Sequence, residues 1–358
     1  MRVLLVNDHP PGPTGGAEVH VGRVADALVD AGCSVRVLVP DVPHRGVRRA
    51  LDLWDPGARR GVRGAIAAFR PDVVHLHNVL DELSTSVAGL GVPTVLTVHD
   101  HRLLGTRVGM DQGRSLWSPG VAARAAKNRF ARWRLRREVN ATIAPSRTLA
   151  DDLRRAGYPA VHHVENFAPA TPIAALGPDI VFVGGLHPHK GPQVLLDAWA
   201  QVARRHDGVR LRIVGDGPLR TTLAASAAAA GIEDRVVLPG AVPPSAVAGE
   251  LARACIVAVP SLGAEGGGPT LAVVEAMAAG RGVVVTDRPG VVEGVDDAVG
   301  VVVPAGDVVA LAAALDELLS DPTRLENLGA AAAARAAERW SPEVACRSLL
   351  RVYREVCR

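Results

Sequence analysis

Three consecutive glycines, Gly266–Gly268, stand before a helical pattern that runs to Gly280. Pro269 suits the first helical position, and the N–H groups that follow it would have no acceptor inside the helix. Bare backbone and the positive end of a helix suit a diphosphate. We therefore predict that four residues bind one: Gly267, Gly268, Thr270 and Leu271.

Two glutamates flank this turn, and a carboxylate repels phosphate but accepts hydrogen bonds from sugar hydroxyls. Glu275 lies within the apolar run "LAVVEAMAA", where a charge is costly unless it has a partner. Its side chain can point back toward the helix start, so we predict a ribose contact. The alternative is a solvated helix residue. Glu265, before the glycines, is predicted to face sugar hydroxyls as a catalytic-site carboxylate.

A second glycine-rich bend, "FVGGLHPHKG", joins a strand pattern to a helix and contains Gly184 and Lys190. A lysine beside such a bend can bind phosphate, and a hydrogen bond to a charged group contributes roughly 1.5–3 kcal/mol. A solvated surface lysine is the alternative. The bend does not have the G-x-x-x-x-G-K-[ST] spacing of a Walker loop.

The first strand pattern, "RVLLV", leads into another glycine-containing loop, "DHPPGPTGGAEVH". Gly15 and Gly16 let the backbone approach a ligand, and the helix after them offers N–H groups to an anion. A plain tight turn is the alternative. The glycines lack the G-x-G-x-x-G spacing of dinucleotide-binding enzymes, which argues against NAD as a cofactor.

Histidines follow two further strand patterns. His99, Asp100 and His101 come together at the end of "TVLTVHD", and a His–Asp pair at a strand end favours a functional His99 over a structural histidine. His75 and His77 alternate along another strand and share one face. These histidines do not have the spacing of metal ligands, so no metal site is predicted.

Strand patterns alternate with helical patterns in both halves of the chain, which predicts two parallel sheets with right-handed crossovers. Ligands of such sheets bind beyond the carboxyl ends of the strands, where the residues above stand. The proline-rich stretch 166–178 predicts a linker. We expect one Rossmann-like domain over 1–168 and a second over 178–340. A final helix over about 341–358 can pack back on the first.

Composition narrows the classes of function. The chain has 40 Lys+Arg and 37 Asp+Glu, and this balance argues against nucleic acid as a partner. The start does not have the pattern of a signal peptide, and no apolar stretch of about 20 residues is present. The four cysteines lie far apart, which is typical of reduced thiols. We expect a cytoplasmic protein.

A basic segment with interleaved apolar residues covers 124–137. One interpretation is peripheral contact with the inner face of a membrane, or with an acidic or lipid-linked substrate. The other is a solvated helix face. The basic residues are Arg124, Lys127, Arg129, Arg132, Arg134, Arg136 and Arg137.

Taken together, these motifs resemble the retaining glycosyltransferases of family 4, the glycosyl transferases group 1. The segments "GGAE", "HDHRLL", "APSR", "ENF", "FVGGLHPHKG", "LRIVGDGP", "VVLPGAVP" and "VPSLGAEGGGPTLAVVEAMAAGRGVVVT" occur in the order of that family. The resemblance covers nearly the whole chain. It implies an α/β protein of GT-B architecture, with two Rossmann-like domains facing across a cleft.

The resemblance also implies an activity. A hexose-type sugar would pass from a nucleoside-diphosphate donor to an unidentified acceptor (a natural product, polysaccharide or lipid-linked molecule), with retention of configuration and without a cofactor or a metal. Lys190 would neutralise the departing diphosphate with help from the Gly16 backbone, and Glu275 would bind ribose. The backbone near Val242 would contact the base, and His99 would contact the transferred sugar.

Two departures from the family stand out. Gly184–Gly185 replace its common Gly-Arg pair, which removes one cation from the diphosphate site. Nine residues separate Glu265 from Glu275, two more than in the family. Two alternatives stay open: a GT-B-fold sugar-nucleotide epimerase, and an inactive protein that binds sugar nucleotides.

Overall fold

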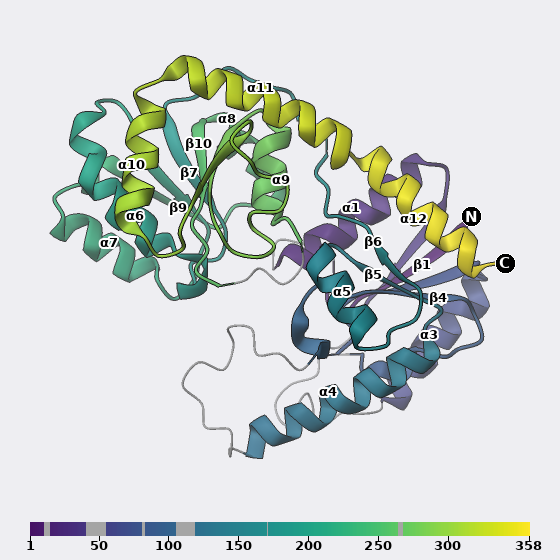
Figure 1. Cartoon of the computed structure of the whole chain (residues 1–358). Coiled ribbons are helices and arrows are strands. Elements are labelled where there is room, and N and C mark those ends of the chain that lie inside the picture. Colours follow the sequence, from purple (N-terminus) through teal and green to yellow (C-terminus); the bar gives the residue numbers. More distant parts are fainter. Residues whose placement is uncertain (11–14, 41–54, 81–82, 105–118, 170, 264–267) are drawn as a thin grey trace. The chain divides into compact units, whose positions relative to one another are not determined.

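The computed structural model describes seven stretches of the 358-residue chain (Figure 1): 1–10, 15–40, 55–80, 83–104, 119–169, 171–263 and 268–358. The chain folds into two compact units, each with its own sheet and hydrophobic core. The first unit is formed by Met1–Glu165, Gly266–Gly268 and Pro342–Arg358, and the second by Asn166–Glu265 and Pro269–Ser341.

The first unit contains a six-stranded parallel sheet of order β2-β1-β3-β4-β5-β6. Its strands are β1 (Arg2–Val6), β2 (Ser34–Leu38), β3 (Val73–Leu76), β4 (Thr94–Thr97), β5 (Ala141–Ala144) and β6 (Val161–His163). Its helices are α1 (Gly16–Asp30), α3 (Pro56–Phe69), α4 (Pro119–Glu138), α5 (Arg147–Arg155) and α12 (Pro342–Val356), with 3-10 turns η1 (Thr85–Val87) and η2 (His101–Leu104).

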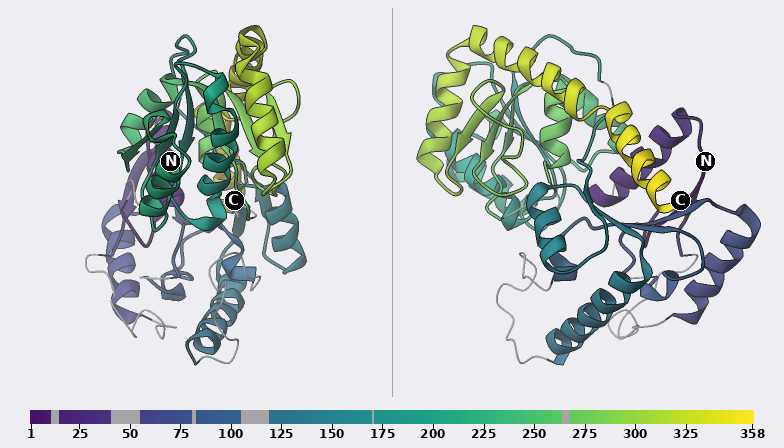
Figure 2. Two further views of the ribbon diagram at one scale, coloured as in Figure 1. Left: turned by 90° about the vertical axis from the view of Figure 1, so that its left-hand side faces the viewer. Right: turned by 45° about the vertical axis from the view of Figure 1, so that its right-hand side comes forward.

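Local chemistry places these helices. Asp55 caps α3 by accepting from the Gly57 and Ala58 amides, and Ser146 caps α5 by accepting from the Leu149 amide at 3.0 Å. The C-terminal α12 packs beside α1 although the two are far apart in sequence (Figure 2).

The second unit repeats the pattern with a sheet of order β12-β11-β10-β7-β8-β9, again parallel. Its strands are β7 (Asp179–Val183), β8 (Leu211–Val214), β9 (Val236–Gly240), β10 (Ala254–Val259), β11 (Gly282–Thr286) and β12 (Gly300–Val303). Its helices are α6 (Pro192–Val202), α7 (Arg220–Ala229), α8 (Pro244–Ala252), α9 (Leu271–Ala278), α10 (Val308–Leu319) and α11 (Pro322–Arg339), with 3-10 turns η3 (Pro188–Lys190), η4 (Ala203–Arg205) and η5 (Glu233–Arg235).

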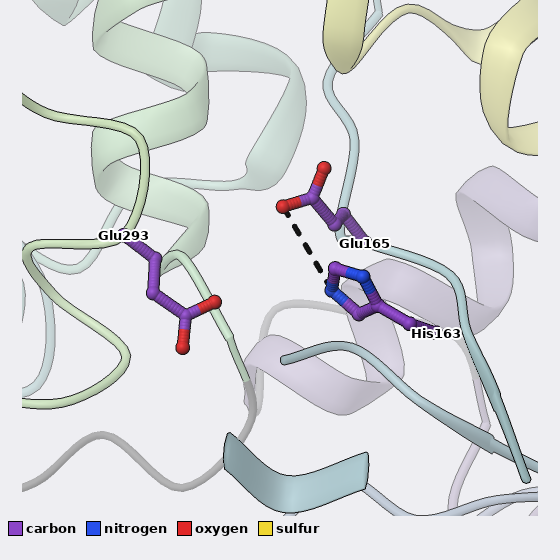
Figure 3. A group of neighbouring side chains, drawn as sticks. All are labelled: His163, Glu165 and Glu293. Carbon is purple, nitrogen blue, oxygen red and sulfur yellow. Dashed lines mark ion pairs between the residues drawn. The ribbon is translucent and has the colours of Figure 1, made fainter. Parts of the chain in front are cut away.

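The proline-rich stretch after β6 is irregular in structure but fixed to the second unit. The buried Arg281 guanidinium donates to the carbonyl oxygens of Ala174 and Ala175 at 3.0 and 3.1 Å. On the other side of the division, His163 Nε2 lies 3.8 Å from a Glu165 carboxylate oxygen (Figure 3). Glu293, the third residue drawn, belongs to the second unit, and the pair alone offers fewer ligands than a zinc ion needs.

Both sheets have a point where the strand order reverses direction. In the first sheet it lies between β1 and β3, and in the second between β7 and β10. Ligands of open parallel sheets bind outside the carboxyl ends of the strands at such points. The loops that follow these four strands are therefore the places to look for a site.

Candidate active site

Lys190 lies at the reversal point of the second sheet, at the end of η3, and only Gly191 separates it from α6. Gly191 after it has φ +70°, and a Cβ atom there would lie 2.0 Å from the Pro260 carbonyl oxygen. Only glycine fits this close approach to the end of β10. The Leu262 amide also donates to the His189 carbonyl at 2.7 Å. The backbone thus fixes the half-buried Lys190 beside the loop that follows β10.

Gly184 is in contact with the loop that follows β8. The Gly184 amide donates to the Val214 carbonyl at 3.0 Å. A Cβ atom on Gly215 would lie 1.9 Å from the Gly184 carbonyl oxygen. Gly185, which stands where the family commonly has an arginine, lies beside His187. A Cβ atom on Gly185 would lie 3.0 Å from His187 Cδ2, so an imidazole occupies the space beside this residue.

Helix α9 begins after the reversal point on the β10 side. Thr270 is its N-cap, with Oγ1 accepting from the Val273 amide at 3.4 Å, and the first helical residue is Leu271. The prediction that Pro269 starts the helix is wrong, because the Thr270 side chain caps it and the helix begins two residues after Pro269. The Leu271 amide has no acceptor inside the helix. Gly268 is buried with φ +94°, a conformation that favours glycine.

Sequence reasoning did not assign a role to Asn166, which supports this turn. Its side-chain amide donates to the Pro269 carbonyl at 3.1 Å, directly before the cap. Glu265 and Gly267, predicted at the sugar and the diphosphate, lie outside the described residues. The structure therefore describes Gly268, Thr270 and Leu271 of the predicted diphosphate turn.

Glu275 is half-buried within α9, one turn after its start, between the buried Val274 and Ala276. Val242, predicted near the base, lies in the turn between β9 and α8 and is also half-buried. Strand β9 is at the edge of the sheet and β8 separates it from β7. A ligand that contacts both Lys190 and Val242 has to extend along the carboxyl edge of these strands.

Four histidine rings gather at the reversal point of the first sheet. His20 comes from α1, His75 from β3, His77 from the residue after β3, and His99 from the loop after β4. The ring centroids of His75 and His77 are 4.1 Å apart, those of His77 and His99 5.4 Å, and those of His20 and His99 5.3 Å. His77 Nδ1 lies 3.1 Å from His99 Nε2. Sequence reasoning placed His75 and His77 on one face but missed His20.

His101 follows β4 with His99, as the sequence indicated, but its side chain makes a different contact. His101 Nε2 lies 3.2 Å from Asp152 Oδ2 on α5, so this histidine belongs to the packing of η2 against α5. His75 is also structural. Its Nδ1 lies 2.7 Å from the Tyr353 hydroxyl of α12, and its Nε2 lies 2.7 Å from Thr97 Oγ1.

Burial keeps three of the four rings neutral. Desolvation, with a smaller contribution from His99, lowers the pKa of His75 from 6.5 to about 3. Desolvation also lowers the pKa of His20 and His77 well below 6.5, with smaller contributions from the neighbouring histidines and, for His20, from Arg23. Neutral imidazoles can donate from one nitrogen and accept at the other, so this cluster is a hydrogen-bonding array at pH 7.

These pKa values predict a strong pH dependence of stability. Below pH 6.5 the unfolded chain binds protons at these histidines, whereas the folded unit does not. Their contribution to the free energy of unfolding is therefore fully present above pH 6.5 and decreases as the pH drops toward the folded-state pKa values. With three such groups, the free energy of unfolding changes with pH by up to about 4 kcal/mol per pH unit. Urea unfolding between pH 5 and 8 measures it. His20→Phe should make the slope shallower, and the exposed His189→Gln should not. Equal stability at pH 5 and 7.5 would contradict the burial of neutral rings.

Gly15 and Gly16 stand where the loop after β1 meets α1. Gly15 is the N-cap, and a Cβ atom on it would lie 2.5 Å from the Glu18 carboxylate. The predicted loop glycines therefore have a carboxylate at the helix start. Because a carboxylate repels phosphate, this helix end is better suited to hydroxyl groups than to the diphosphate predicted for the Gly16 backbone.

The basic segment forms most of α4, and several of its side chains hold loops of the first unit. Arg132 donates to the Leu104 carbonyl, Arg134 to the Thr85 and Ala88 carbonyls, and Arg136 to the Gly157 carbonyl. Lys127 is buried. The Arg124 side chain lies outside the described residues.

The outer side of α4 is different. Trp133 is 49% exposed, and the exposed Arg137 stacks over its ring at 4.7 Å, with exposed Arg129 one turn earlier. Within the described part of the chain, no helix is long and apolar enough to cross a membrane.

Comparison with known proteins decides the family. Residues 14–171 match the family described as "Glycosyltransferase Family 4", and residues 177–321 match "Glycosyl transferases group 1". A phosphatidyl-myo-inositol mannosyltransferase of Mycobacterium leprae is 30% identical over 389 aligned positions, which cover 99% of this chain and 97% of the relative. The chain belongs to glycosyltransferase family 4. The resemblance seen in the sequence motifs is confirmed.

Further relatives of this family 4 glycosyltransferase agree. An alpha-D-kanosaminyltransferase of Streptomyces kanamyceticus is 28% identical, with 75% of this chain and 72% of the relative covered. Sucrose-phosphate synthase from Thermosynechococcus elongatus superimposes with a TM-score of 0.76 at 19% identity, covering 99% and 98% of the two chains. HepE of Anabaena, solved with UDP, gives a TM-score of 0.72 at 20% identity, covering 99% and 100%. The predicted GT-B fold is confirmed.

Proposed function

We propose that this glycosyltransferase moves a hexose-type sugar from a nucleoside-diphosphate donor to an acceptor hydroxyl, with retention of configuration and without a metal or cofactor. One observation carries the proposal: Lys190 and the start of α9 follow the two strands at the reversal point of the second sheet. Support also comes from the relatives, which are named as mannosyl- and kanosaminyltransferases. Fold neighbours were solved with UDP and with UDP-glucose.

The chemistry required of these residues is stabilisation of a leaving group. As the bond between the sugar and the diphosphate breaks, negative charge grows on the phosphate oxygens. The Lys190 ammonium and the amides of Thr270 and Leu271 would stabilise that charge. The acceptor hydroxyl attacks the same face of the sugar, and its proton passes to a departing phosphate oxygen. Positioning supplies most of the remaining rate enhancement.

We place the acceptor against the first unit, where the histidine cluster and α1 offer hydrogen bonds. An anionic or lipid-linked acceptor fits the exposed outer side of α4 best, because Arg129, Trp133 and Arg137 are exposed there and hold no loop among the described residues. Basic and aromatic side chains together favour anionic interfaces. Binding to anionic vesicles tests this part of the proposal separately from sugar transfer.

A ribose contact of Glu275 has a specific consequence. Glu275→Gln should weaken UDP binding by about tenfold, since a carboxylate that accepts from a hydroxyl is replaced by a weaker acceptor. The variant should bind 2′-deoxy-UDP nearly as well as the wild type if the 2′-hydroxyl is the group recognised. Isothermal titration calorimetry with the two nucleotides measures the difference. Equal losses for both would assign Glu275 to helix packing or to the 3′-hydroxyl.

The proposed donor class is tested with a thermal-shift panel of UDP, GDP, ADP and dTDP sugars. A ligand that binds only the folded state raises Tm. At a concentration of about 100 times its Kd it stabilises the folded state by about 2.7 kcal/mol. We expect at least one sugar nucleotide to raise Tm and its free sugar to leave Tm unchanged. A panel in which no nucleotide changes Tm would refute a donor site in the second unit.

A further inference from the structure

His77 and His99 are joined directly by a hydrogen bond between two imidazole rings, with His77 Nδ1 and His99 Nε2 3.1 Å apart. The two rings are stacked at an interplanar angle of 25°. His77 is fully buried, whereas His99 is half-buried. The inner ring of the pair is therefore shielded from solvent, and the outer ring is partly exposed.

The remaining nitrogen of His77 decides which partner donates. His77 Nε2 is buried and has no hydrogen-bond partner among the described residues. A buried N–H group without an acceptor is rarer in folded proteins than a buried acceptor without a donor. This preference places the proton of the neutral His77 ring on Nδ1, from which it is donated to His99 Nε2. The low pKa of His77 agrees, because a neutral ring carries only one N–H.

We propose that His77 is a positioning residue that fixes the ring orientation of His99 and holds it in the Nδ1–H tautomer. Because Nε2 of His99 accepts from His77, the proton of a neutral His99 lies on Nδ1. A neutral histidine side chain in water favours the opposite tautomer, so the pair overrides an intrinsic preference. His99 would then act toward a substrate as a hydrogen-bond donor through Nδ1 and would not be a general base through Nε2.

The supporting contacts make His77 well suited to this role. His75 packs against it with 4.1 Å between ring centroids, and His75 is itself held by Tyr353 and Thr97. The inner part of the cluster is thus anchored to β4 and to α12. Such outer partners commonly change activity by about 10- to 100-fold when they orient a functional histidine, as shown for metal-bound histidines.

The tautomer is measured directly by 15N NMR of the histidine rings, with His99 assigned by the loss of its signals in His99→Gln. We expect a pyrrole-type Nδ1 and a pyridine-type Nε2 for His99 at pH 7.5. His77→Asn retains an amide near the Nδ1 position and should preserve this pattern. His77→Gln places its amide near the Nε2 position and should lose it, as should His77→Phe. Thermal unfolding identifies any variant that does not fold.

A wild-type His99 with its proton on Nε2 would overturn the proposal, and so would an unchanged tautomer in His77→Gln. The effect on transfer rests on the proposed function: His77→Gln should lower kcat about tenfold, with His77→Asn within about threefold of wild type and the KM for the sugar donor unchanged in both. The tautomer measurement stands without any activity. An enzyme that transfers no sugar would therefore refute the proposed function and leave the tautomer result intact.

Discussion

Lys190→Ala is expected to lower kcat for sugar transfer by about 100- to 1,000-fold, because it removes the cation that stabilises the departing diphosphate. The backbone around Lys190 is fixed by Gly191 and by the loop after β10, so the variant should fold normally. Lys190→Arg keeps the charge and should retain part of the activity. Arg204→Ala is the matched control, since Arg204 is exposed in η4, which follows the C-terminal end of α6.

The same prediction can be checked without a known acceptor. The chain has two lysines, of which Lys127 is buried and Lys190 half-buried. An amine-acylating reagent followed by mass spectrometry should label Lys190 first, and UDP should slow that labelling with no effect on Lys127. Near wild-type turnover and UDP affinity in Lys190→Ala would show that this lysine is a surface residue with no part in phosphate binding.

His99→Ala is expected to lower kcat about 10- to 100-fold while the Kd for UDP changes by less than about twofold. The proposed contact of His99 is with the transferred sugar, and a hydrogen bond made mainly in the transition state affects turnover more than nucleotide binding. Steady-state kinetics and calorimetry with UDP measure the two effects. His101→Ala is the control, because His101 pairs with Asp152 on α5. Equal losses of turnover and UDP affinity would make His99 a structural histidine.

The strand patterns of the sequence predicted ten of the twelve strands that the described residues form, because buried parallel strands read as short continuous apolar runs. The two that were missed, β6 and β12, are the last strands of their sheets. Strand β6 contains two histidines and is half-buried, so its sequence "VHH" carries no apolar signal. Edge position and partial burial are tertiary properties that single-sequence periodicity does not report.

The site was predictable where its residues follow strands, and less so where side chains converge from distant elements. Lys190 and Thr270 could be found from glycine-rich bends and helix starts. The start of α9 was misplaced by two residues because proline and threonine both suit a helix N-terminus, and the threonine cap prevails. His20 lies on a helix far in sequence from His77 and His99, and only the crossover of α1 over the sheet brings them together.

The most direct test of the account is the fate of the sugar donor that raises Tm most in the thermal-shift panel. Its turnover is followed by 1H NMR during prolonged incubation, with water as the acceptor because no other acceptor is supplied. We predict release of the nucleoside diphosphate together with a sugar that first appears with the anomeric configuration of the donor and only later equilibrates. A product that first appears with the opposite configuration would contradict retention. A donor converted to its epimer without release of the diphosphate would contradict transfer itself.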